Sequence, residues 1–305
     1  KDAGDKADKS KERFSKLGSV LKGVGVAMGA VVTAAAATAV KLGKEVVNAY
    51  ADYEQLVGGV DTLFKGSSQK LQSYASNAYK TAGLSANDYM DTVTGFSASL
   101  IQSLGGDTDK SVKYADMAIT DMADNANKMG TDMSLIQNAY QGFAKQNYTM
   151  LDNLKLGYGG TKEEMQRLLS NAEKISGIKY DISSYADVVD AIHVMQESMD
   201  IAGTTAKEAE GTISGSVNAL KSSVTNLVVG FGDANADLGE LCENVVTAFQ
   251  TVLENISPIV ENLISALPTV ITTLLESAGE MLPTVLETLA ELFAQVLEGL
   301  LQLLP

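Results

Sequence analysis

Residues 238–305 read LGELCENVVTAFQTVLENISPIVENLISALPTVITTLLESAGEMLPTVLETLAELFAQVLEGLLQLLP. From Leu238 to Leu304 an apolar residue recurs every 3 or 4 positions, in six repeats of 11 residues. Residues that repeat every 11 positions stay on one face of a straight or slightly right-handed supercoiled helix. Residues in a heptad repeat would drift away from that face over the same distance. The segment therefore predicts a helical rod about 100 Å long, at about 1.5 Å per residue.

The recurring residues form an apolar stripe that one helix cannot bury alone. We predict that the stripe packs in an oligomer, since exposed apolar faces of this size mark interaction sites. Its phase is kept past Pro258, Pro268 and Pro283, which favours a kinked but collinear helix, or helices laid end to end, over a hairpin. Ala278 fills one position of the stripe, and the predicted packing residues are Leu238, Cys242, Val245, Phe249, Leu253, Ile256, Val260, Ile264, Leu267, Ile271, Leu275, Leu282, Leu286, Leu289, Phe293, Leu297, Leu300 and Leu304.

Composition and charge narrow the class of protein. The chain has 45% apolar residues, 4 prolines and no Trp, which is typical of an all-helical protein. Its formal net charge is −15, and residues 222–305 contain 11 acidic side chains but no Lys or Arg. This third of the chain should repel nucleic acid and anionic lipid alike. The single cysteine, Cys242, excludes an internal disulfide framework.

The N-terminal part has two segments of different character. Residues 1–22 alternate in charge, which predicts a solvated helix or a disordered lead-in. Residues 23–46 predict a Gly/Ala-rich apolar helix, and 23–40 carry no charge, at the lower length limit of a membrane span. Because Ala and Gly contribute little transfer energy, close packing against a copy or a partner is favoured over insertion, with Gly25 and Gly29 at the spacing for it.

Residues 47–232 predict a compact helical domain with glycine-marked turns. No stretch shows bounded two-residue alternation, so no sheet is expected. Helix starts are marked by capping patterns at Ser85 with Asp88, Asp107 or Thr108, Thr161 with Glu164, Ser184 with Asp187, and Thr205 with Glu208. The predicted fold is thus all-α, with a lead-in (1–22), an apolar helix (23–46), a helical core domain (47–232) and a rod (233–305).

Candidate catalytic and ligand-binding residues are few. His193, the single histidine, lies between apolar residues of a helical pattern and is predicted to be structural or exposed. No Cys/His cluster can form a usual zinc site, LGYGGTKEE (156–164) lacks the Gly-Lys-Ser/Thr order of a phosphate loop, and the Asp-rich run 116–132 lacks calcium-loop order. We expect no catalytic, metal or cofactor-binding residue. A carboxylate-based glycosidase is the enzymatic alternative, although no spacing marks its carboxylate pair.

Three stretches of the chain carry a family resemblance. They are YKTAGLSANDYMDTVTGFSASLIQSLGGD (79–107), NAYQGFAKQNYTMLDNLKLGYGGTKEEMQRLL (138–169) and AEGTISGSVNALKSSVTNLVVGFGD (209–233). Together with the Gly/Ala-rich segment before them and the apolar repeat after them, the chain resembles the tail tape measure proteins of siphophages and prophages of Gram-positive hosts. The resemblance covers most of residues 20–305, and 138–169 is its most specific part.

The resemblance implies a structural role in the virion. Such proteins are assembled in the host cytoplasm and run through the tail tube lumen as a parallel homo-oligomer, here expected to be a trimer or hexamer. They template tube polymerisation, set tail length, contact the tail tube protein and tail-tip or baseplate proteins, and leave before the DNA. Some then act at the host membrane, and no sequence-specific nucleic acid is expected as a partner. Since the family is usually longer, we expect a fragment, a processed form or a short-tail version. The alternative is a membrane-active helical protein that inserts through 23–40 to form or assist a DNA-entry channel.

Overall fold

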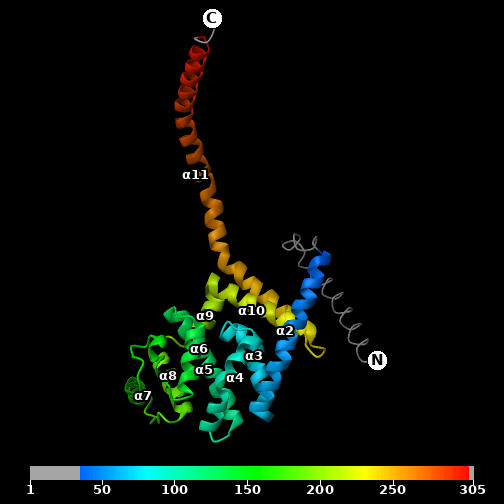
Figure 1. The fold of residues 1–305 in the computed structure, drawn as a ribbon, viewed down its shortest axis with the longest axis vertical. Helices are drawn as coiled ribbons and strands as arrows, with labels where there is room; N and C mark the ends of the chain where they lie inside the picture. Colours follow the sequence, from blue (N-terminus) through cyan, green and yellow to red (C-terminus); the bar gives the residue numbers. More distant parts are fainter. Residues whose placement is uncertain (1–34, 302–305) are drawn as a thin grey trace. The chain divides into compact units, whose positions relative to one another are not determined.

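The structure is a computed structural model that describes residues 35–301 of the chain. Every regular element in this range is a helix, which confirms the predicted all-α fold (Figure 1). The predicted lead-in (1–22), most of the apolar helix 23–46, and Leu304 lie outside the described residues. The helices are α2 (Ala35–Phe64), η2 (Lys65–Ser67), α3 (Ser68–Thr81), α4 (Ala86–Ser103), α5 (Thr108–Met129), α6 (Met133–Phe143), η3 (Leu151–Leu154), α7 (Lys162–Ser176), α8 (Tyr185–Ser198), α9 (Thr204–Gly211), α10 (Ile213–Gly232) and α11 (Leu238–Leu301).

The chain divides into two compact units, Lys1–Val252 and Leu253–Pro305. The sequence placed the start of the rod at residue 233, whereas the two units meet within α11. The reason is visible in the first turns of α11, where Ala248 and Val252 are buried. These turns therefore belong to the first unit.

Helix starts follow the local capping patterns. Ser85 accepts a hydrogen bond from the Asp88 amide at the start of α4, and Thr161 accepts one from the Glu164 amide at the start of α7. Such caps satisfy backbone N–H groups that a helix leaves open at its first turn. Asp107 caps α5 and Ser184 caps α8 in the same way, so these four predicted helix starts are confirmed.

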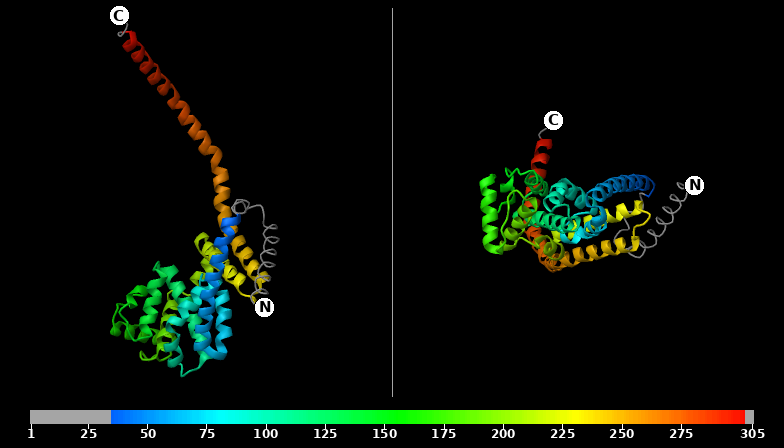
Figure 2. Two further views of the ribbon diagram at one scale, coloured as in Figure 1. Left: turned by 45° about the vertical axis from the view of Figure 1, so that its right-hand side comes forward. Right: turned by 90° about the horizontal axis from the view of Figure 1, so that it is seen from below.

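The main core of the first unit is formed by side chains from α2 to α8 and from the turns between them. α5 packs against α3, α4, α6, α8 and α9, and α2 lies alongside α3 and α4 (Figure 2). The largest fully buried side chains include Phe64, Tyr89, Tyr140 and Phe143. The tyrosines of the core thus serve packing.

The segment that follows α8 differs from its prediction. The sequence marks one helix start here, at Thr205 with Glu208, but the structure has two helices, α9 and α10. Thr212 ends α9 in an extended conformation, and its side chain accepts a hydrogen bond from the Gly215 amide at the start of α10. The cap at Thr212 therefore separates the two helices.

α11 is a single helix of 64 residues that continues through Pro258, Pro268 and Pro283. This confirms the long C-terminal helix that the stripe predicts. No helix in the described range is long and apolar enough to cross a membrane.

Candidate interaction sites: the apolar repeat and the α9–α10 seam

The apolar repeat of α11 is wider than the predicted stripe. Ala248 and Val252 are buried, yet neither belongs to the stripe. When the sequence is written in rows of 11 from Leu238, the stripe fills the first, fifth and eighth positions. Two further positions are apolar in all six rows. They are the fourth (Leu241, Val252, Leu263, Leu274, Val285, Val296) and the eleventh (Ala248, Ile259, Val270, Met281, Leu292, Leu303).

These five positions form one apolar arc. At about 100° per residue, the first, fourth, fifth, eighth and eleventh positions of the repeat cover about 120° of the helix circumference. The predicted stripe is a single line of apolar residues and leaves out the two neighbouring rows, although the sequence itself contains them.

The acidic residues of the repeat lie away from this arc. The sixth position is Glu in five of the six repeats, namely Glu243, Glu254, Glu276, Glu287 and Glu298. This position lies about 160° from the centre of the arc. Ser265 fills it in the third repeat, and the remaining Glu residues of α11 also fall outside the arc. The repeat thus separates an uncharged face from a carboxylate face.

The structure places the predicted stripe residues in two environments. In the first unit, Leu238, Cys242, Val245 and Phe249 are half-buried. In the second unit Ile256 is half-buried, while Val260 is exposed. The side chains of Leu253 and Ile264 are 52% and 63% exposed. The stripe residues Leu267, Ile271, Leu275, Leu282, Leu286, Leu289, Phe293, Leu297 and Leu300 lie in α11, but their side chains are outside the described set, as are Gly25 and Gly29.

A second candidate site is the seam between the α9–α10 pair and the core. At the start of α9, the buried carboxylate of Asp124 on α5 accepts hydrogen bonds from the backbone N–H groups of Gly203 (2.5 Å) and Thr205 (2.7 Å). The Asn127 amide donates to the Thr205 hydroxyl at 2.9 Å. A carboxylate at a helix N-terminus accepts hydrogen bonds from open N–H groups and interacts favourably with the positive end of the helix dipole. α5 therefore supplies the cap that the sequence assigned to residues of α9.

α10 meets the core through small and polar side chains. Ser216, Ser223 and Asn226 are buried, and so is Ser222, whose hydroxyl donates to the Gly83 carbonyl at 2.9 Å. Asn226 accepts a hydrogen bond from the Ala86 amide at 2.8 Å. Small residues allow close backbone approach but contribute little hydrophobic energy.

The outward side of α10 carries three exposed apolar residues. Ile213 is 36% exposed, Val217 43% and Val224 41%. The fully buried face of α10 is thus mainly small and polar, while Leu220, Leu227, Val228 and Phe231 are half-buried. Apolar periodicity alone cannot show which face of a helix meets the core when the neighbouring surface offers polar partners.

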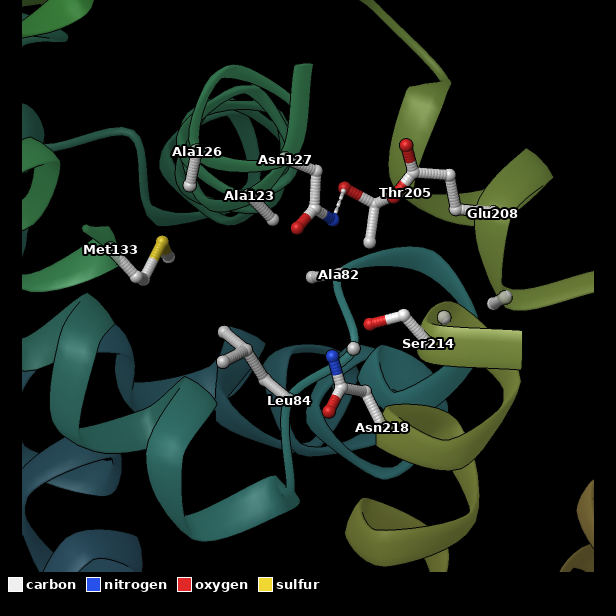
Figure 3. Close-up of a pocket in the computed structure, with 13 residues that line it drawn as sticks. Ala82, Leu84, Ala123, Ala126, Asn127, Met133, Thr205, Glu208, Ser214 and Asn218 are labelled. Atoms are coloured by element: carbon white, nitrogen blue, oxygen red, sulfur yellow. Dashed lines mark hydrogen bonds between the residues drawn. The ribbon is translucent and has the colours of Figure 1, made fainter. Parts of the chain in front are cut away.

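A cavity of about 180 Å³ lies along the seam (Figure 3). Ala123 and Asn127 of α5 line one side, and Glu208, Ser214 and Asn218 of α9 and α10 line the other. A cavity of this size holds several water molecules, and its mixed lining offers them hydrogen-bond partners. The seam is thus polar and incompletely packed.

His193 is tied to a buried carboxylate. Its Nδ1 lies 2.8 Å from Oδ1 of Asp121, and its Nε2 lies 3.4 Å from Glu197. Burial raises the pKa of the Asp121 carboxyl to about 6, and the hydrogen bond to Asp121 raises the pKa of His193. This pair joins α5 to α8, and neither residue lines the cavity at the seam.

The described residues hold no group of His, Cys, Asp and Glu side chains arranged to bind a metal ion. In comparisons with known proteins, no family model, no curated protein and no solved structure matches the chain.

Proposed function

We propose that this chain is a non-enzymatic helical scaffold that self-assembles through α11, in the role of a tape measure protein of a phage tail. The observation that carries the proposal is the repeat of α11. Its apolar arc is uncharged over six repeats, and the described arc residues of the second unit, such as Leu253 and Ile264, are largely exposed. An apolar surface of this extent requires a cover in water.

Copies of the same helix fit this surface. In a parallel, in-register assembly, apolar arcs meet at the centre while the sixth-position Glu rows face outward, about 160° from the arc. Repulsion between carboxylates of neighbouring copies is then small. Apolar rows would also meet in an antiparallel pairing, or in a parallel pairing staggered by one whole repeat. The repeat alone therefore does not fix the register between copies, and contacts at the ends of the helix must fix it. A parallel trimer or hexamer meets these requirements.

Other covers fit the charge less well. α11 contains no Lys or Arg, so its face does not attract the phosphates of DNA or of anionic lipids. Interfacial membrane helices usually carry basic residues on their polar side, whereas the polar side of α11 carries Glu. A protein cover, from further copies or from a tube wall, is favoured.

The phage-tail setting comes from the sequence resemblance, and it gives the repeat a measurable role. If the length of α11 contributes to tail length, removing residues 260–281, which are two whole repeats, should shorten assembled tails by about 33 Å, at about 1.5 Å per residue. Electron microscopy of tails assembled with the shortened chain measures this difference.

A phase-breaking deletion is the matched control. Removing residues 260–276 shortens the helix by a similar amount but rotates the following arc by about 100°. This variant should fail to support tails of uniform length. Tails of unchanged length with the 22-residue deletion incorporated would refute the tape measure role.

A further inference from the structure

The α9–α10 pair lies outside the main hydrophobic core of its unit. The buried side chains of that core come from α2 to α8 and the adjoining turns. Tyr79, Ala209 and Ala219 form a separate small cluster between α3, α9 and α10. A large apolar side chain contributes about 1.5–3 kcal/mol on burial and an alanine much less, so the two alanines that α9 and α10 supply to this cluster contribute little. Val229 is a buried large apolar residue of α10, and Leu220, Leu227, Val228 and Phe231 are half-buried.

Hydrogen bonds take the place of apolar contacts at the seam. They join Asp124 to α9, Asn127 to Thr205, Ser222 to the Gly83 carbonyl and Asn226 to α4. Each such bond contributes about 1 kcal/mol net, because water replaces it when the groups separate. The cavity beside them gives water a place to enter (Figure 3). The hydrogen-bonded part of the seam, on α3 to α5, can therefore open to water without exposing large apolar side chains of α10.

The chain on either side of the pair is suited to such an opening. Between α8 and α9, Asp200 has φ 55° and Gly203 has φ 78°. A non-glycine residue with positive φ is conformationally strained, and local strain is relieved when the segment is released. At the other end, Gly230 lies against Leu241, so the first turns of α11 stay with α10.

We propose that α9 and α10 form a latch that opens from α2–α8 as one unit, about a hinge at 199–203, while the main core stays folded. Ile213, Val217 and Val224 on the outward face of α10 are already exposed in the closed state. Opening lets this face move away from the core together with the helix. The latch is independent of the phage-tail proposal, because it rests on the seam alone. Local openings of this kind have free energies between zero and that of global unfolding.

Two serines provide a matched test of the latch. Ser223 in α10 and Ser97 in α4 are both fully buried, and each hydroxyl donates to a carbonyl of its own helix. Each is replaced by cysteine in the full chain carrying Cys242→Ser, and reaction of the thiol with a disulfide reagent is followed under native conditions. The latch predicts that Ser223→Cys reacts at least about tenfold faster than Ser97→Cys, with a weaker dependence on urea.

A third substitution links the reaction to the seam. Asp124→Asn removes the charge that caps α9, so it should speed modification of the thiol at 223 by about tenfold. The thiol at 97 reacts only when the whole unit unfolds. Its rate, divided by the equilibrium constant of global unfolding, should therefore not change. Equal rates and equal urea dependence at 223 and 97 would overturn the latch. So would a thiol at 223 that reacts as fast as a free thiol, because the seam would then not be closed.

Hydrogen exchange on the unaltered chain gives a second measurement if a cysteine variant does not fold. Amides of α10 should exchange through openings at least about tenfold more frequent than those of α5. A common opening constant for the two helices would reject the proposal in the same way.

Discussion

Ile264 and Ser265 are neighbours on α11, and they separate the two faces of the repeat. Ile264 occupies the fifth position, inside the apolar arc, and its side chain is 63% exposed in the single chain. Ser265 occupies the sixth position, where the other five repeats carry Glu. Glutamate can therefore be introduced on either face with the same change in charge and a shift of one residue.

The expected cost differs strongly between the two positions. Burial of an Ile side chain contributes about 1.5–3 kcal/mol, and 63% of the Ile264 surface remains to be covered, so its loss costs about 1–2 kcal/mol per copy. A carboxylate at the same place must also be desolvated or protonated, which adds at least about 2 kcal/mol. Ile264→Glu should therefore weaken a trimer by about 9 kcal/mol in total, at about 3 kcal/mol per copy.

This loss is large on a concentration scale. Since 1.4 kcal/mol is a factor of about 10 in an equilibrium constant, and trimer dissociation depends on the square of the concentration, the midpoint concentration of assembly rises by about a thousandfold. Ser265→Glu completes the outer Glu row and should change the stability of the assembly by less than about 0.5 kcal/mol.

Sedimentation velocity and light scattering of the full chain over a dilution series measure both variants against the parent chain. Circular dichroism of each sample checks that the helical content of the first unit is kept. The reasoning fails if Ile264→Glu assembles at the same concentration as the parent chain. It also fails if the two variants dissociate equally, because overall charge and not the arc would then govern assembly.

Three further predictions concern the first unit, each checked by urea unfolding against the parent chain. Asp121 binds its proton more tightly when folded, so it contributes stability that falls as pH rises from about 4 to 6. The stability difference between the parent chain and Asp121→Asn should shift over that range by up to about 3 kcal/mol, and a difference independent of pH would contradict this. Thr161→Ala removes the cap of α7 and should cost about 1 kcal/mol, whereas an unchanged midpoint would show the cap to be redundant. Gly58→Ala, in an open position of α2, should stabilise by up to about 1 kcal/mol, while Gly160→Ala should destabilise by at least about 2 kcal/mol, because its Cβ would lie 2.2 Å from the Thr149 carbonyl oxygen. Effects of the same sign at both glycines would refute this.

The sequence predicts well those features that depend on neighbouring residues. The caps at Ser85 and Thr161 involve groups three positions apart, so their patterns can be read directly along the chain. The long helix α11 follows from a regular repeat, and its continuity through Pro258 agrees with the kept phase.

Features that depend on distant residues were missed for a physical reason. The cap of α9 comes from Asp124, about 80 positions earlier in the chain, and no local pattern marks it. The buried polar face of α10 was unforeseen because Ser222 and Asn226 find partners on α3, α4 and the turn between them. The sequence contains the wider arc of α11, but it is the burial of Ala248 and Val252 that shows the arc to extend beyond the predicted stripe.

The distribution of basic residues has a practical consequence for detecting this chain. Lys221 is the last basic residue of this sequence, so trypsin, which cuts after Lys and Arg, does not cut between residues 222 and 305, and the peptide that contains them has at least 84 residues. Such a peptide is too long for routine peptide mapping, and the whole of α11 would be missed in a tryptic digest. A glutamate-specific protease cuts at least once in each of the six repeats, so it is the enzyme of choice for mapping this helix and its cross-links.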